Sequence, residues 1–338
     1  MIGDLLQNSK AYQEFKKDLS ADNMSHAYLF LGEDKLVRRE YMRLFASTVL
    51  CRAGGCGVCD TCDKIYNDAH LGVHYYNLDG KMNVKVAESL IEESYKSSWE
   101  GNEVADEGRS SGASKRIYFI DNIDELSPVV SPAVQNKLLK IFEEPPKNVI
   151  IALFAKSSYG ILQTILSRAK ICYLPLFTTE EVYEELLSEG HARGVAEISA
   201  TLSGGSFEKA YRFVEDEGYY TQFSECFEVL KGCKNSTMVS DYIYSPIFSK
   251  ENIARTLEFL SIILRDVQIR VSGATVPYVT RNRDYDVKEI SEGYTTASVA
   301  MAILEVNNGI TMLSSNINNT TVAERVLFKI LEAKYKWQ

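Results

Sequence analysis

Three short runs of apolar residues occur in the first half of the chain, at residues 27–31, 117–120 and 149–154. The first run stops at Gly32 and the second at Asp121. Uninterrupted apolar runs of this length are typical of strands that are buried on both faces of a sheet. The pattern therefore predicts three buried strands.

Residues with helical spacing follow these runs. After Gly32, one broad apolar face is predicted from Leu36, Met42, Leu44, Phe45 and Val49. Ser131 as N-cap and Pro132 at the first helical position predict a second helix, which must end before Pro145. This helix is expected to bury Val134, Leu138, Ile141 and Phe142. Strands that alternate with helices up to about residue 175 predict a parallel sheet covered by helices on both faces.

Beyond Pro175 the pattern is helical, and no further strand is predicted. Thr178 and Glu181 predict a capping box at the start of a helix. A last helix is predicted to open at Thr321, with Glu324 three residues later. Between them, one long stripe of helical spacing consists of Ile253, Leu257, Leu260, Leu264, Val267 and Val271. Residues 101–114, rich in glycine, serine and acidic side chains, predict a mobile surface loop.

The length and composition indicate a globular protein with several domains. The chain has 338 residues, more than one hydrophobic core usually holds, and it is 45% hydrophobic and 25% charged. The changes of pattern predict an α/β domain over residues 1–175, a small acidic helical domain over 176–236 and a helical C-terminal domain over 237–338. The start has no basic segment typical of a secretory signal, and no apolar run approaches the roughly 18 residues of a membrane span. We therefore expect a cytoplasmic protein without a membrane partner.

The negative charge is concentrated in one part of the chain. The formal net charge is −9, and residues 176–230 alone carry −9, with twelve acidic and three basic side chains. A phosphate-binding surface that covers the whole protein, of the kind that dominates DNA affinity, is therefore not expected. Any contact with nucleic acid should be local or shared with a partner.

Four of the seven cysteines lie within twelve residues: Cys51, Cys56, Cys59 and Cys62. Their spacing is C-x4-C-x2-C-x2-C, and four thiolates complete the tetrahedral coordination of Zn²⁺ without an open position for water or substrate. We therefore predict one structural zinc ion per chain. An iron–sulfur centre uses the same ligands, and a loop of free thiols is the remaining alternative.

The segment from Gly32 to Arg39 follows a strand and opens a helix, which is where a phosphate-binding loop is found. That loop requires a second glycine, a lysine and a hydroxyl residue, but the chain has Val37, Arg38 and Arg39. After the second strand, Asp121 has the position of a metal-organising aspartate, while Asn122 replaces the carboxylate that activates water in an ATPase. The sequence therefore predicts a degenerate nucleotide site, unless both segments are ordinary turns.

Several segments together resemble a known family. They are residues 25–30, the cysteine loop, residues 115–121, residues 135–146 and residues 165–168. In this order they resemble the delta-prime subunits of the bacterial DNA polymerase III clamp loader. The run that ends in Glu143-Glu144-Pro145-Pro146, followed by Ser167-Arg168, is the most specific part. Two departures are Ala169, where the family usually has cysteine, and Ala155-Lys156-Ser157, where it usually has a Thr- and Asn-rich segment.

The resemblance implies an α/β fold of the AAA+ P-loop type with an inserted zinc module, a helical lid domain and an all-α C-terminal collar that mediates oligomerisation. It implies a non-hydrolysing subunit of a DNA polymerase III complex that binds no ATP. Its partners would be gamma/tau ATPase subunits and a delta subunit. It would reach the sliding clamp and primer-template DNA through the assembled complex. Arg168, with Ser167, would act as an arginine finger on nucleotide held by a neighbouring subunit.

Two alternatives remain open at the level of the sequence. The first is a gamma/tau-like AAA+ ATPase with an unorthodox nucleotide site, which predicts ATP binding by the isolated chain. The second is a zinc-containing nucleic-acid-binding module without a ring partner, which predicts tight binding of duplex DNA by the isolated chain. The neutral to acidic charge of the sequence disfavours the second alternative.

Overall fold

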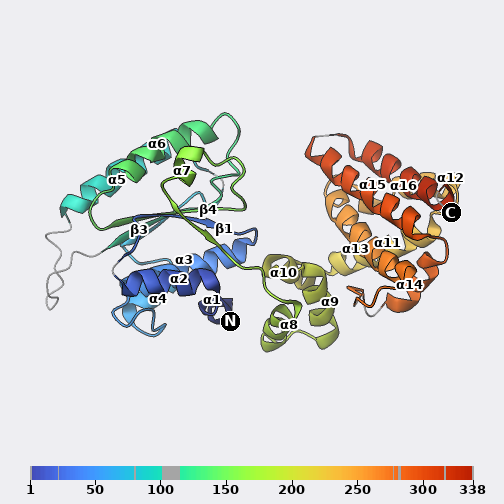
Figure 1. Ribbon diagram of the computed structural model, residues 1–338, viewed down its shortest axis with the longest axis horizontal. Helices are drawn as coiled ribbons and strands as arrows, with labels where there is room; N and C mark the ends of the chain where they lie inside the picture. Colours follow the sequence, from blue (N-terminus) through green and yellow to red (C-terminus); the bar gives the residue numbers. More distant parts are fainter. Residues whose placement is uncertain are drawn as a thin grey trace. The chain divides into compact units, whose positions relative to one another are not determined.

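The computed structural model describes residues 2–21, 23–79, 81–100, 115–276, 278–280, 283–315 and 317–336 (Figure 1). They form two compact units. The α/β unit comprises Met1–Glu181 and Ser206–Glu208, and the helical unit comprises Val182–Gly205 and Lys209–Gln338. The loop predicted over residues 101–114 lies outside the described residues. The domain boundaries near residues 175 and 236 stay predictions.

The α/β unit is built on a five-stranded parallel sheet with the order β2-β3-β4-β1-β5. Its strands are β1 (Ala27–Leu31), β2 (Val73–Tyr76), β3 (Arg116–Ile120), β4 (Val149–Ala155) and β5 (Lys170–Tyr173). The three predicted strands are the three central ones, β3, β4 and β1. The predicted fold class, an α/β domain with a parallel sheet followed by helical parts, is confirmed. The two edge strands, β2 and β5, were not predicted.

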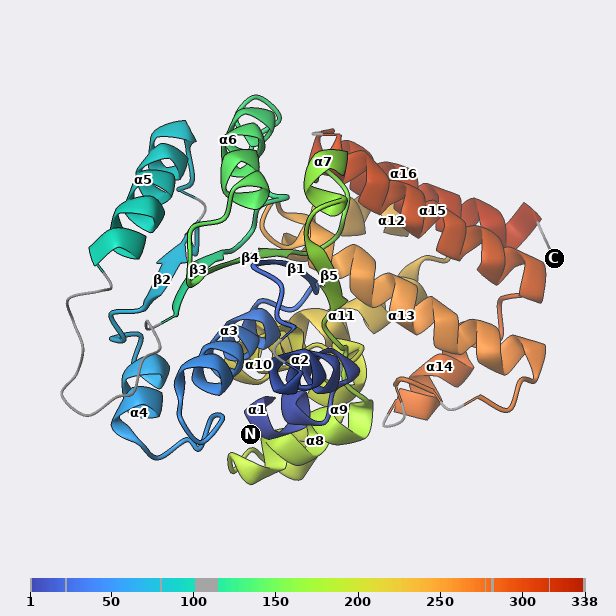
Figure 2. The same ribbon diagram turned by 60° about the vertical axis from the view of Figure 1, so that its left-hand side comes forward.

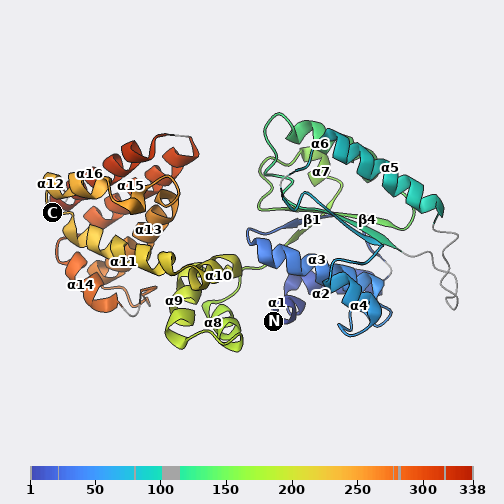
Figure 3. The ribbon, with the colours of Figure 1, turned by 180° about the vertical axis from the view of Figure 1, so that it is seen from behind.

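Helices cover both faces of the sheet (Figure 1, Figure 3). One layer contains α1 (Ile2–Gln7), α2 (Lys10–Ser20), α3 (Lys35–Leu50) and α4 (Asp60–Tyr66). The other contains α5 (Val84–Glu100), α6 (Ser131–Glu143) and α7 (Gln163–Leu166). The two layers explain why the central strands are apolar without interruption, since both faces of each strand are buried.

Alternate side chains of β1 enter the two halves of this core. Tyr28 and Phe30 lie on the side of α3, where their ring centroids are 5.3 and 5.6 Å from that of Phe45. Leu29 and Leu31 belong to the apolar core on the side of α5 and α6. The core is therefore largely aromatic on one face of the sheet and aliphatic on the other.

Three details of the predicted helices are wrong. The N-cap of α6 is Val130, and Ser131 lies inside the helix, where its hydroxyl accepts a hydrogen bond from the Gln135 side chain at 2.8 Å. Leu36 is 36% exposed, because the residues that the first turn of α3 buries are Val37 and Arg38. The last helix begins at Asn319 and not at Thr321, because the Asn318 side chain already accepts from the Thr320 amide.

The helical unit contains α9 (Arg193–Ser203), α11 (Glu217–Gly232), α12 (Ser236–Ile243), the 3-10 helix η1 (Pro246–Phe248), α13 (Ile253–Ser272), α14 (Asp284–Ser291), α15 (Thr296–Ser314) and α16 (Asn319–Lys336). Two helices, α8 (Thr179–Ser188) and α10 (Phe207–Glu215), begin in the α/β unit and end in the helical unit. The predicted Thr178–Glu181 capping box is confirmed, because each residue's side chain accepts from the other's backbone amide. One apolar core spans α11 to α16, and α13 packs against α11, α14 and α15 (Figure 2). Within the described residues, no helix is long and apolar enough to cross a membrane.

Candidate functional site

The turn between β1 and α3 occupies the position of the predicted phosphate-binding loop. Gly32 donates its amide hydrogen to the Ala155 carbonyl at 2.9 Å and lies against the side chain of Leu174. A Cβ atom on Gly32 would be only 2.9 Å from Leu174 Cβ, so a larger residue would clash. The structure thus supplies a packing reason for glycine at this position that does not involve phosphate.

Arg38 fills the centre of this turn with its own side chain. It is 1% exposed and donates through Nε to Asp121 Oδ1 at 2.9 Å and through Nη2 to Asn122 Oδ1 at 2.7 Å. Its Nη1 donates to the backbone carbonyls of Gly32 at 2.8 Å and Glu33 at 3.2 Å. Four oxygen atoms therefore converge on one guanidinium, and carbonyl groups of the turn face the position that phosphate would require amide groups to face.

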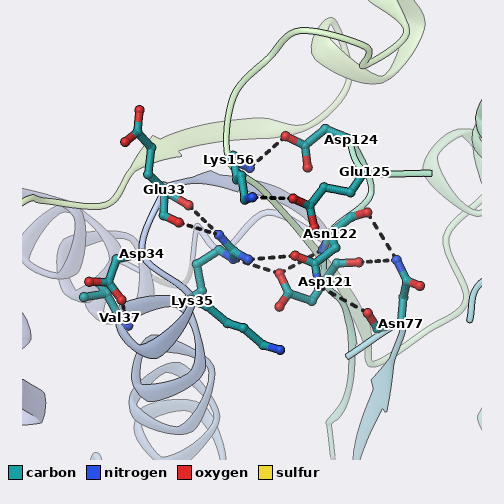
Figure 4. A network of polar contacts seen from close by, with 12 residues as sticks. Glu33, Asp34, Lys35, Val37, Asn77, Asp121, Asn122, Asp124, Glu125 and Lys156 are labelled. Carbon is teal, nitrogen blue, oxygen red and sulfur yellow. Dashed lines mark hydrogen bonds and ion pairs between the residues drawn. The ribbon is translucent and has the colours of Figure 1, made fainter. Parts of the chain in front are cut away.

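Asp121 and Asn122 belong to a network of polar contacts that includes Asn77 (Figure 4). Asn122 has the left-handed backbone conformation, with φ of 49°, and donates its amide hydrogen to Asp121 Oδ1 at 2.8 Å. Asn77, at the end of β2, donates through Nδ2 to the backbone carbonyl of Asp121 at 2.7 Å. Burial raises the pKa of the Asp121 carboxyl, and the positive charge of Arg38 opposes this rise. Asp121 is therefore part of a buried ion pair.

The first amide groups of α3 also have partners from the chain itself. The Asp34 carboxylate caps the helix and accepts from the amides of Leu36 at 2.9 Å and Val37 at 3.0 Å. The amide of Lys35 donates to Glu208 Oε2 at 3.1 Å. A helix N-terminus is a natural anion site, and here two carboxylates of the protein occupy it.

The remaining residues of the predicted nucleotide site lie elsewhere. Val37 is 1% exposed in the core. Arg39 points to the far side of α3, where it pairs with Asp68 and its guanidinium lies 4.3 Å from the centroid of the Tyr75 ring. The structure therefore brings Gly32, Arg38, Asp121 and Asn122 together, and it separates Val37 and Arg39 from them.

The four clustered cysteines form a second candidate site, between α3 and α4. Their sulfur atoms all lie within 4.8 Å of one another, and Cys51 Sγ is 3.7 Å from the sulfurs of both Cys56 and Cys59. Sulfur ligands about 2.3 Å from a tetrahedral metal ion are about 3.8 Å apart, so the spacing fits one ion. Gly55 and Gly57 adopt φ angles of 92° and 74°, which side chains rarely adopt, and allow the loop to turn around the cluster.

The backbone around the cluster favours thiolates, which are the form that binds a metal. Hydrogen bonding to Cys51, above all from the Cys56 amide, lowers the pKa of Cys51 to about 6. The amide of Val58 likewise lowers the pKa of Cys56. Burial raises the pKa of Cys62 to about 12, so this thiol would release its proton to solvent only when the metal binds. These four residues can hold a metal ion with no open coordination position.

Arg168 lies at the end of α7, directly after the C-cap Ser167. Its side chain is 39% exposed and pairs with Glu143 at the end of α6, with 3.0 Å between Nη2 and Oε1. Its Nη1 also donates to the carbonyl of Thr164 at 3.1 Å. The arginine is accessible, and in the isolated chain its partner is a local carboxylate.

Asp34 and Glu208 were not predicted as members of the site. An aspartate between a strand and a helix is a typical N-cap signal, and this signal could have identified Asp34. Glu208 reaches the site from 173 positions further along the chain, as its bond to Lys35 shows. No local pattern indicates such a contact.

Comparisons with known proteins agree with the resemblance seen in the sequence. The chain is 25% identical to DNA polymerase III subunit delta' of Bacillus subtilis over 93% of both chains. It is 29% identical to DNA polymerase III subunit tau of Escherichia coli, but that match spans 56% of this chain and only 28% of tau. Among solved structures, a gamma subunit-related protein of Thermotoga maritima and the Bacillus subtilis clamp loader delta protein align with TM-scores of 0.39 and 0.33. The family model described as DNA polymerase III, delta subunit, matches residues 7–178, just over half of the chain, and the chain therefore belongs to this family.

Proposed function

We propose that this chain is a non-hydrolysing subunit of the DNA polymerase III clamp loader, which helps to place the sliding clamp on primed DNA during replication. The observation that carries this proposal is the buried guanidinium of Arg38 at the centre of the phosphate-loop turn. A cytoplasmic location follows from this role and belongs to the proposal.

The other groups with which a P-loop enzyme binds nucleotide are here bonded to residues of the chain itself. Nucleotide binding requires backbone amides that face the phosphates, and Asp34 and Glu208 accept from those at the start of α3. It requires a hydroxyl on Mg²⁺, and the corresponding Arg39 pairs with Asp68. Without these groups, the γ-phosphate is neither positioned nor neutralised, which supports a chain that neither binds nor hydrolyses ATP.

The partners in this proposal are gamma/tau ATPase subunits and a delta subunit, with the clamp and primer-template DNA reached through the assembled complex. The surface of α15 supports a helical contact with another subunit. Its exposed residues are all uncharged: Thr296, Ala297, Ala300, Leu304, Asn307, Ile310, Thr311 and Ser314. The single charged residue of α15, Glu305, is 14% exposed and pairs with Arg325 of α16. A face of this spacing suits packing against a second helix.

Arg168 is proposed to act in trans on nucleotide held by a neighbouring ATPase subunit. Its guanidinium is permanently charged and has planar donors that match phosphate oxygens. The ion pair with Glu143 is exposed on both sides, at 39% and 51%, so exchanging this partner for a phosphate costs little.

The cysteine cluster is proposed to hold one structural Zn²⁺ ion per chain. The ion would fix the loop between α3 and α4 through Cys51, Cys56, Cys59 and Cys62 and would take no part in chemistry, since no ligand position is open.

Reconstitution of the clamp loader tests the proposal. The chain should co-purify with gamma/tau and delta subunits, and Arg168→Ala should leave assembly intact while it slows DNA-stimulated ATP turnover by about 10³-fold or more. Arg168→Lys should restore little of the ATP turnover, because a lysine ammonium lacks the planar pair of donors with which a guanidinium binds two phosphate oxygens. Arg193→Ala, which removes an exposed arginine of α9, is the control and should turn over ATP at the wild-type rate. Failure to assemble, or a wild-type rate with Arg168→Ala, would contradict the corresponding part of the proposal.

The similarity to tau favours one second candidate, an ATPase subunit of the gamma/tau kind with an unorthodox nucleotide site. This candidate requires that Arg38 leave the turn when ATP binds. It therefore predicts Mg²⁺-dependent ATP binding by the pure chain, which the first candidate excludes.

A further inference from the structure

The carboxylate of Asp34 joins the starts of two helices that are far apart in the sequence. Its Oδ1 caps α3 and accepts from the amides of Leu36 at 2.9 Å and Val37 at 3.0 Å. Its Oδ2 accepts from the Ser206 hydroxyl at 2.8 Å and from the Glu208 amide at 3.0 Å, at the start of α10. Both oxygens are thus fully used, and the residue is 3% exposed.

Each of the two helix starts supplies a carboxylate that accepts a hydrogen bond from a backbone amide of the other. While Asp34 accepts from the Glu208 amide at 3.0 Å, the Glu208 side chain accepts from the Lys35 amide at 3.1 Å, in the first turn of α3. The first amides of a helix have no partner within the helix and carry the positive end of its dipole. Two such ends, from α3 and α10, therefore meet at carboxylates supplied by the opposite segment.

Apolar residues cover the buried part of this arrangement, around Asp34 and Ser206. Phe207 is fully buried, and its ring centroid lies 5.0 Å from that of Phe177 in the segment that leaves the sheet. Leu174, 8% exposed, covers Gly32 at the other side of the turn. Because Asp34 and Ser206 are both buried, a hydrogen bond lost between them is not readily replaced by one to solvent.

We propose that Asp34, Ser206 and Glu208 form a latch, a conformational device that couples the first turns of α3 and α10 without any bound ligand. A free anion at a helix N-terminus holds its surroundings only while it is bound. A carboxylate that belongs to the chain acts permanently, so the start of α10 stays attached to the phosphate-loop turn whether or not nucleotide is present. Disturbing one of the two helix starts therefore loosens the other. This coupling is independent of the proposed function.

The competing explanation is that Asp34 is an ordinary N-cap of α3 and that its contacts with Ser206 and Glu208 are incidental. The two explanations differ in what happens at a distance. An ordinary cap affects only the first turn of its own helix. The latch transmits the effect between positions more than 170 residues apart in the sequence, as the separations of the paired residues show.

Amide hydrogen exchange of the full-length chain, resolved by residue, tests the latch. Asp34→Asn replaces one carboxylate oxygen with an NH₂ group, which cannot accept a hydrogen bond. The amides of Leu36, Val37 and Glu208 should then all exchange at least about tenfold faster. Asp216→Asn is the matched control, because Asp216 caps α11 through the Gly218 amide at 2.9 Å. Its Oδ2 pairs with the side chain of Arg255 and not with a backbone amide, so this substitution should change amide exchange in α11 alone. Faster exchange confined to α3, with the Glu208 amide unchanged, would overturn the latch.

Ser206→Ala tests the same coupling from the other side and removes only one hydroxyl. It leaves both hydrogen bonds from α3 to Asp34 Oδ1 in place. The latch predicts faster exchange at the Glu208 amide and also at the Lys35 amide, whose acceptor is the Glu208 side chain. This variant decides the question if Asp34→Asn does not fold. An unchanged Lys35 amide in Ser206→Ala would show that the two helix starts are independent.

Discussion

Arg38 and Asp121 form a buried ion pair across the carboxyl ends of β1 and β3, with 2.9 Å between Nε and Oδ1 and side chains 1% and 3% exposed. Both residues stand where a P-loop enzyme would bind nucleotide and metal. The pair neutralises the two charges inside the protein and leaves neither side chain available to a ligand.

The buried ion pair predicts that removing Arg38 destabilises the protein much more than removing its neighbour Arg39. Arg38→Ala would leave Asp121 buried without its partner, and the free energy of unfolding should fall by about 3–5 kcal/mol. Arg39→Ala removes a guanidinium that is 24% exposed, and it should cost about 1 kcal/mol or less. Urea denaturation of both variants checks this. Equal losses would mean that the Arg38 pair contributes no more than a surface ion pair.

The cysteine cluster predicts one equivalent of tightly held metal. Protein purified without added metal should contain about one zinc per chain by elemental analysis, and Cys59→Ala should lose it. Cys172→Ala is the control, because Cys172 is a buried cysteine in β5 outside the cluster, and it should keep the metal. Full retention of zinc in Cys59→Ala would show that the ligands are wrongly assigned, and iron with a visible absorption spectrum would indicate an iron–sulfur centre instead.

The ion pairs of Asp286 predict a pH dependence of stability. Burial alone would raise the pKa of Asp286, but hydrogen bonds from Lys231 and Arg283 hold it below its usual value. A carboxyl with a lowered pKa in the folded state stabilises the protein above its unfolded pKa of about 4 and loses this contribution as the pH falls further. The wild type should therefore lose more stability between pH 7 and pH 3 than Asp286→Asn does.

Glu332 provides the comparison for this prediction. Hydrogen bonds from Lys329 and Lys336 also lower its pKa, but its side chain is 42% exposed. Water screens such pairs, so Glu332→Gln should follow the wild-type pH profile in urea denaturation. The same flattened profile in both variants would contradict a specific role for the Asp286 pairs.

Gly309 lies where α15 packs against α16, and its surroundings predict that alanine there destabilises the protein, whereas alanine at the open position Gly194 stabilises it. A Cβ atom on Gly309 would lie 2.5 Å from Val326 Cγ2 and 3.2 Å from Leu257 Cδ1. Gly309→Ala should therefore destabilise the protein by about 1–3 kcal/mol, despite the higher helix propensity of alanine. Gly194→Ala in α9 meets no atom within 4 Å and should stabilise by up to about 1 kcal/mol. Thermal unfolding of the two variants checks the contrast, and a stabilised Gly309→Ala would mean that the helices are less closely packed.

The central strands were predictable because the two-sided burial of a parallel sheet produces uninterrupted apolar runs. The edge strands lack this signal. In β5, Tyr173 is 71% exposed and Ile171 is 37% exposed, and β2 has only one fully buried residue, Val73. A short strand with a single buried residue does not differ in pattern from a loop.

The candidate sites divide in the same way. The cysteine cluster was predictable because its ligands are close in sequence, and the structure brings all four sulfurs together. The departure from the P-loop sequence could also be read directly from Val37, Arg38 and Arg39. The contacts that fill this turn could not be predicted, because the side-chain partners of Arg38 and the partners of Asp34 at the start of α10 lie 83 to 174 positions away and depend on the tertiary fold.

Calorimetric titration of the pure chain with ATP and Mg²⁺ tests the central claim most directly. With Arg38 in the turn and Asp34 and Glu208 on the amides of α3, the account predicts no binding heat at millimolar ATP and no turnover. Binding in the micromolar range with Mg²⁺-dependent hydrolysis would contradict it, and would identify the chain as an ATPase subunit.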